Sequence, residues 1–114
     1  MMTRRAVLAA GAAALALPAR AGTQSLAALA AAKAFVFGSA TANYELKDTD
    51  FVPVLAREAA ILVPEYEMKR NLIEPQPDVY DFSAVDRLVD FAHRHGMVFR
   101  GHPLVWYAAN PPWL

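Results

Sequence analysis

Short apolar runs alternate along the chain with segments in which apolar residues recur at helical spacing. Two runs, residues 34–37 and 60–63, end at Gly38 and Pro64. A third strand is predicted over residues 97–105, after Gly96. Compact apolar runs of this kind are typical of strands buried on both faces of a parallel sheet. The pattern therefore predicts three strands, separated by segments long enough to hold crossover helices.

Two of the intervening segments carry an apolar stripe. Apolar residues at positions 51, 54, 55 and 59 share one helical face, which predicts a first crossover helix capped by Thr49 or Asp50. In the second crossover helix, Ser83 and Asp86 have the spacing of a capping box, and Gly96 follows the last turn. These helices would place neighbouring strands parallel to each other, so the fold class is α/β.

A leading helix is predicted ahead of the first strand. Residues 25–33 are rich in strong helix formers, and Ser25 can serve as the N-cap. Leu26 and Leu29 lie three residues apart, which favours a packed helix over an alanine-rich linker. The polar residues 41–50, and the chain from Pro64 to the second helix, are predicted to be loops.

Residues 1–21 have the parts of an export signal. Arg4 and Arg5 precede an apolar stretch, residues 6–18, which is too short to span a bilayer, and a small-x-small site closes the segment at Ala21. The paired arginines favour the twin-arginine route, so we expect a periplasmic or secreted protein. The alternative is an amphipathic helix of the mature fold, but this stretch has no polar face.

Charge and cysteine content narrow the possible partners. Removal of residues 1–21 takes away three arginines and leaves residues 22–114 net acidic. No basic patch remains to recruit nucleic acid or an anionic membrane. The chain has no cysteine, so neither a disulfide framework nor thiolate chemistry is available.

The groups suited to chemistry follow the predicted strands. They are Asn43 after the first strand, the polar cluster of residues 65–69 after the second, and His102 with Trp106 after the third. Loops at the carboxyl ends of parallel strands meet on one face, so these groups would converge. An imidazole beside a flat indole suits a sugar, which presents hydroxyls and an apolar ring face.

Two motifs resemble those of a known family. Residues 64–69 read PEYEMK and residues 101–106 read GHPLVW, and Trp113 follows. These motifs resemble the "PENxMK" and "GHTLVWH" signatures of family 10 glycoside hydrolases, the endo-β-1,4-xylanases. The resemblance implies the first three strands of a (β/α)8 TIM barrel. It also implies that five residues bind substrate: Glu65, Lys69, His102, Trp106 and Trp113.

The resemblance covers residues 35–114, with departures at the sugar-contacting positions. Tyr66 stands where the family has Asn, Tyr107 where it has His, and Ala109 where it has Gln. These departures suggest a divergent subgroup with partly rebuilt sugar contacts. Xylan is therefore implied as a substrate class, together with related β-1,4-linked polysaccharides.

Each assignment has a structural alternative. Glu65 and Lys69, four residues apart, could form a surface ion pair. His102, Trp106 and Trp113 could serve packing alone, and for Trp113 the two interpretations weigh equally. Glu65 and Glu67 are not a catalytic pair, because a retaining glycosidase presents its two carboxyls across the sugar, normally from different strands.

The family's two catalytic glutamates follow the fourth and seventh barrel strands, so the resemblance assigns no catalytic residue within these residues. It implies no metal and no cofactor, and it implies a cis bond between His102 and Pro103. We expect residues 22–114 to be the N-terminal portion of a catalytic barrel that hydrolyses internal xylosidic bonds. An inactive sugar-binding remnant and a glycosidase of another barrel family are the alternatives.

Overall fold

The computed structural model describes residues 24–114, and the predicted export signal, residues 1–21, lies outside them. Strands and helices alternate as predicted, and short helices also form within two segments predicted to be loops. In chain order the elements are α2 (Leu26–Ala31), β1 (Gly38–Thr41), the 3-10 helix η1 (Asn43–Lys47), α3 (Phe51–Glu58), β2 (Ile61–Pro64), α4 (Arg70–Ile73), α5 (Ser83–Arg94), β3 (Val98–Phe99) and the 3-10 helix η2 (Tyr107–Ala109).

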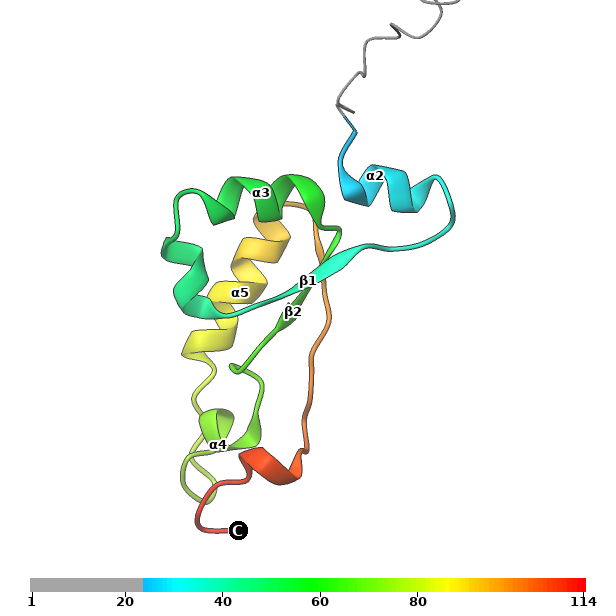
Figure 1. The fold of residues 1–114 in the computed structure, drawn as a ribbon. Coiled ribbons are helices and arrows are strands. Elements are labelled where there is room, and N and C mark those ends of the chain that lie inside the picture. The colour runs from blue at the N-terminus through cyan, green and yellow to red at the C-terminus, as the bar shows by residue number, and fades with distance from the viewer. Residues whose placement is uncertain (1–23) are drawn as a thin grey trace, which may run out of the picture.

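The three strands form one parallel sheet in the order β1-β2-β3, which confirms the predicted topology. Gly38 on β1 lies opposite Ile61 on β2, and Ile61 lies opposite Val98 on β3. Helix α5 packs against β2 and β3, with α3 beside it (Figure 1). The core between these helices and the sheet is made of Leu55, Ala59, Leu62, Leu88, Phe91, Ala92 and Met97.

The first strand begins at Gly38, after the predicted residues 34–37. Ala34 has a φ of 59°, and Phe35 donates its backbone N–H to a carbonyl of α2 over 3.0 Å, so the chain is still closing the turn after that helix. A Cβ on Gly38 would lie 2.6 Å from the carbonyl oxygen of Ile61. The missing side chain therefore allows β1 to approach β2, which hydrophobicity alone does not reveal.

The third strand is much shorter than the predicted residues 97–105. The N–H groups of Val98 and Arg100 donate over 2.9 Å to the carbonyl oxygens of Ala60 and Leu62, respectively. The pairing between β3 and β2 then stops. Beyond it, Pro103 has no N–H to donate. The side chain of Val105 is 77% exposed. The apolar character of this stretch therefore does not reflect burial in the sheet.

Two aspartates that precede the helices, Asp48 and Asp81, take the capping roles predicted for residues one or two positions later. The Asp48 carboxylate accepts the N–H groups of Asp50 and Phe51 at 2.9 and 3.0 Å, so neither Thr49 nor Asp50 caps α3. The Asp81 carboxylate accepts the N–H of Ser83 at 2.8 Å, and Ser83 is the first residue of α5 instead of its cap.

Two predicted helix ends are confirmed. The Ser25 hydroxyl accepts the N–H of Ala28 at 3.1 Å and caps α2. Gly96 has a φ of 66° directly after the C-cap of α5, a conformation that suits glycine.

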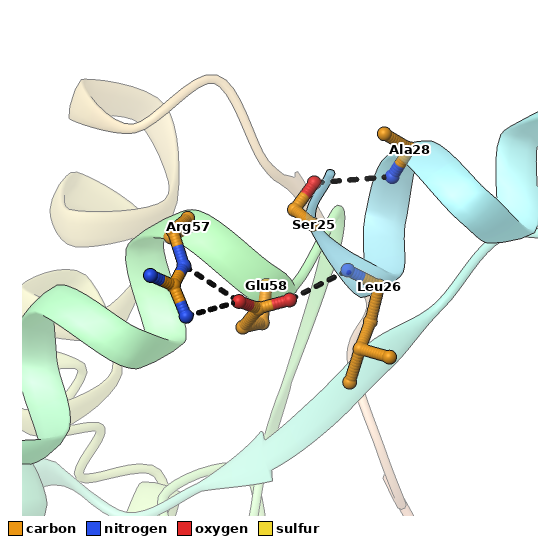
Figure 2. Close-up of polar contacts among 5 residues, drawn as sticks. All are labelled: Ser25, Leu26, Ala28, Arg57 and Glu58. Carbon is orange, nitrogen blue, oxygen red and sulfur yellow. Dashed lines mark hydrogen bonds and ion pairs between the residues drawn. The ribbon is translucent and has the colours of Figure 1, made fainter. Parts of the chain in front are cut away.

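Helix α2 is fastened to α3 through one carboxylate (Figure 2). Glu58 accepts the backbone N–H of Leu26 at 2.5 Å with one oxygen and the Arg57 guanidinium at 2.6 Å with the other. The hydrogen bond from Leu26 is the main cause that lowers the pKa of Glu58. The side chains of Leu26 and Leu29 remain about half exposed, at 48% and 47%, so this polar contact adds to a partial apolar packing of α2.

Candidate functional site

The chain beyond β2 and the chain beyond β3 meet around one hollow. It has a volume of about 230 Å³ and is lined by Glu65, Lys69, His102, Pro103 and Trp106. Both segments follow the carboxyl ends of parallel neighbouring strands, which explains why they lie side by side. Four of the five residues proposed from the sequence are therefore brought together.

The Lys69 ammonium lies over two aromatic rings. Its Nζ is 4.2 Å from the centroid of the Tyr66 ring and 4.8 Å from the centroid of the Trp106 ring. Among residues 24–114, no ion pair joins Lys69 to Glu65. The surface ion pair considered as an alternative is therefore absent, and Tyr66, in place of the expected amide, holds the lysine by a cation–π contact.

Glu67 has a structural role that its sequence spacing did not reveal. Its side chain is nearly buried, at 7% exposure, and one carboxylate oxygen accepts the N–H of Asn43 at 2.5 Å. The other oxygen accepts the N–H of Tyr66 at 3.1 Å. Glu67 thus joins η1 to the segment after β2 and fixes the backbone N–H of Tyr66, the residue directly after Glu65.

His102 and Trp106 lie on an irregular segment between β3 and η2. His102 is exposed, and within the described part of the chain its imidazole has no hydrogen bond to protein groups, so both ring nitrogens are free to meet a ligand. The indole of Trp106 is 41% exposed. Residues 24–114 contain no cis peptide bond, so the expectation of a cis bond before Pro103 is wrong for this structure.

Trp113 lies apart from the hollow. Its indole N–H donates to the carbonyl oxygen of Glu74 at 3.1 Å, and its ring lies 5.1 Å from the Arg70 guanidinium carbon. The same guanidinium pairs with the Glu74 carboxylate at 3.0 Å. In this arrangement Trp113 joins the end of the described chain to α4.

Asn43 lines a different hollow, between η1 and α5. Its neighbour Tyr44 faces a group of acidic residues. The Glu45 carboxylate is the largest cause that raises the pKa of the Tyr44 phenol, followed by partial desolvation and by Glu65. The phenol therefore stays protonated at neutral pH and can donate a hydrogen bond.

No group of three or more histidine, aspartate or glutamate side chains in residues 24–114 is arranged to hold a metal. Within the same residues, every helix is too short or too polar to traverse a membrane.

Comparison with known proteins identifies the family. The sequence profile described as "Glycosyl hydrolase family 10" matches residues 25–114. A "Beta-1,4-xylanase" of Dictyoglomus thermophilum is 39% identical over 80 residues, which cover 70% of this chain and 22% of that protein. The "Endo-1,4-beta-xylanase C" of Phanerodontia chrysosporium is 38% identical over 86 residues, or 74% of this chain and 22% of that protein.

Solved structures show the same likeness. Xylanase 10B of Thermotoga petrophila, crystallised with xylobiose, matches with a TM-score of 0.72 and 35% identity, over 81% of this chain and 29% of its own. Xylanase B of Clostridium stercorarium matches with a TM-score of 0.72 and 30% identity, over 79% and 26% of the two chains.

These likenesses define the three-stranded sheet as the N-terminal part of a TIM-barrel glycoside hydrolase. The chain belongs to glycosyl hydrolase family 10. It spans less than a quarter of the length of the two curated relatives described above.

Proposed function

We propose that this chain supplies part of the sugar-binding wall of a retaining endo-1,4-β-xylanase, which hydrolyses internal β-1,4-xylosidic bonds of xylan. The observation that carries this proposal is the convergence of Glu65, Lys69, His102 and Trp106 on one hollow. A polar rim beside an indole face matches a pyranose ring, which combines hydroxyls with an apolar C–H surface.

Each residue has a distinct part in the proposed contact. The exposed face of Trp106 packs against a sugar ring. Lys69 donates from its ammonium, which the two rings position. Glu65 accepts from sugar hydroxyls, and His102 both donates and accepts through its two ring nitrogens. These contacts would bind the glycone side of the substrate and orient it for cleavage.

The residues that break the bond are proposed to lie outside residues 24–114. A double displacement needs an acid/base and a nucleophile with carboxyl groups about 5–5.5 Å apart across the sugar. Glu67 is unsuited to either role because both its oxygens accept backbone N–H groups. We propose that the two carboxyls come from later barrel strands and that the reaction uses no metal or organic cofactor.

The experiment uses the protein at its full encoded length and measures reducing sugar released from xylan. We expect Lys69→Ala and His102→Ala each to lower kcat/KM by an amount equivalent to about 1.5–3 kcal/mol, typical of a lost hydrogen bond to a charged group or a buried ligand. Lys33→Ala, at an exposed lysine outside the hollow, is the control. Unchanged kcat/KM in both test variants would place these residues outside the site.

A second polysaccharide belongs in the same assay. One relative, 36% identical over 80 residues, is named "Exoglucanase XynX" of Acetivibrio thermocellus. Tyr66 departs from the family's amide at a sugar-contacting position, so a β-1,4-glucan is the competing substrate. Faster hydrolysis of β-1,4-glucan than of xylan would assign the site to glucose-based chains.

For residues 1–21 we propose export by the twin-arginine route to the periplasm or the medium. Fusion of this segment to a folded reporter should direct the reporter out of the cytoplasm, and replacement of Arg4 and Arg5 by lysine should block that export. Export unaffected by the replacement would assign the segment to the general route.

A further inference from the structure

A second hollow lies between η1 and α5 and shares no lining residue with the one around Trp106. Its volume is about 700 Å³. Its lining side chains come from η1 and from α5: Asn43, Tyr44, Leu46, Lys47, Arg87, Asp90 and Arg94. Cations therefore outnumber carboxylates three to one in this lining.

The cations that line this hollow form no ion pair with protein carboxylates in the described part of the chain. Among residues 24–114, neither Lys47, Arg87 nor Arg94 has a carboxylate within ion-pair distance, although Asp90 stands between the two arginines on α5. Glu45 is close to Tyr44, and its carboxylate accepts the backbone N–H of Ala42 at 2.8 Å. Lys47, Arg87 and Arg94 are therefore available to pair with a carboxylate of an incoming ligand.

The other side chains of the lining include an exposed aromatic ring and an amide, which are groups that can bind a sugar. The Tyr44 ring is 64% exposed and presents an apolar face with a hydroxyl at its tip. Within the described chain, the Asn43 side-chain amide has no hydrogen bond to protein, and it can both donate and accept. Guanidinium groups bind carboxylates with two parallel hydrogen bonds, which a neutral sugar cannot use.

We propose that the hollow between η1 and α5 binds a saccharide that carries a carboxylate, with Arg87 and Arg94 holding the carboxylate and Tyr44 packing on the sugar ring. This rests on the proposed function, because it takes the ligand to be a polysaccharide. The bound group is a uronic acid substituent of that polysaccharide.

The test compares two xylo-oligosaccharides of equal length, one neutral and one carrying a single glucuronic acid. Titration calorimetry on the protein at its full encoded length gives a dissociation constant for each. We expect the acidic ligand to bind more tightly. The double variant Arg87→Gln/Arg94→Gln should weaken its binding about tenfold or more and leave the neutral ligand unchanged. The matched control is Lys33→Gln, which removes an exposed cation outside the hollow.

Several results would overturn the proposal. Equal binding of the two ligands by the unmodified protein, or an unchanged preference in the double variant, would exclude this hollow. If sulfate competed as well as glucuronic acid does, the hollow would be a general anion site and not a sugar site. Arg94→Gln alone, near the exposed end of α5, repeats the measurement should the double variant fail to fold.

The outcomes also separate this proposal from the proposed function. If xylan is not hydrolysed but the double variant still loses its preference for the acidic ligand, the enzymatic proposal fails and the carboxylate site stands. If xylan is hydrolysed but the unmodified protein binds the acidic and the neutral ligand equally, the enzymatic proposal stands and the carboxylate site is excluded.

Discussion

A single replacement, Tyr66, changes the contacts of Lys69 but leaves the site residues together around one hollow. The side chain at position 66 is an aromatic ring where the related motif has an amide, and the lysine ammonium lies 4.2 Å from that ring. A cation over an aromatic face keeps its charge and its donors directed outward. The replacement therefore removes one hydrogen-bonding group and positions another.

The site residues could be predicted to the extent that the topology determines them. Glu65, Lys69, His102 and Trp106 lie on the segments that follow two parallel neighbouring strands, and this order places the two segments side by side. Trp113 could not be placed in this way, because its position depends on a hydrogen bond to the Glu74 carbonyl, and sequence spacing carries no signal of that bond.

The two tryptophans are expected to differ in effect. Trp106→Ala should weaken xylo-oligosaccharide binding with little change in stability, because its ring is partly exposed at the hollow. Trp113→Ala should leave binding unchanged and lower stability, with the indole hydrogen bond contributing about 0.5–1.5 kcal/mol. Titration calorimetry and urea unfolding of each variant check this. The opposite pattern would make Trp113 the ligand-binding residue.

At the scale of elements, the order of strands and helices could be read from the sequence, whereas the strand ends and two of the helix caps could not. Hydrophobic runs indicate where a strand can form, but backbone pairing decides where it does. β1 lies after the most apolar residues because Gly38 can approach Ile61, and β3 stops once its pairing with β2 ends. The carboxylates that cap α3 and α5 lie one or two residues before the predicted caps, because several neighbouring polar side chains can serve as caps.

Gly38→Ala is expected to destabilise the sheet. The added Cβ would lie 2.6 Å from the Ile61 carbonyl oxygen and 2.8 Å from its Cβ, so β1 must shift, at a cost of about 1–3 kcal/mol. Gly101→Ala is the matched control, because its Cβ would meet only the mobile end of Met68 at 3.1 Å. Its unfolding free energy should change by no more than about 0.5 kcal/mol. Equal urea midpoints for the two variants would contradict this account.

Acid is expected to loosen α2. The N–H of Leu26 lowers the pKa of Glu58 in the folded state, so this contact stabilises the helix above the carboxyl's ordinary pKa. The stabilisation is lost as the pH falls through the lowered value. Protection of the Leu26 amide from hydrogen exchange should therefore fall in acid. In Glu58→Ala, which has no side-chain acceptor for the Leu26 N–H, it should be low throughout and independent of pH. If the protection of the Leu26 amide still depended on pH in that variant, Glu58 would be excluded as the cause of the pH dependence.

At the scale of the whole molecule, the sheet formed by residues 24–114 has two open sides. β1 and β3 each have one neighbour within the described chain. Phe35 and Val98 are large apolar residues at 70% and 60% exposure. Parallel strands with free edges and exposed apolar groups favour association with other chains.

Residues 22–114 expressed alone are expected not to form a stable monomer. The core is small and the strand edges are unpaired, so we expect broad melting, binding of a hydrophobic dye and elution as aggregates. The same preparation should release no reducing sugar from xylan. A sharp cooperative transition together with a monomeric elution volume would contradict the prediction.

The hydrogen bond from Leu26 to Glu58, which joins α2 to α3, also bears on where this protein can be attached to a solid support. Helix α2 lies at the end of the sheet opposite α4 and η2, so Ser25 is remote from the hollow around Trp106 (Figure 1). A purification tag or an immobilising linker joined ahead of Ser25 would start from that far end. Attachment there should place the hollow around Trp106 on the side of the protein away from the solid support.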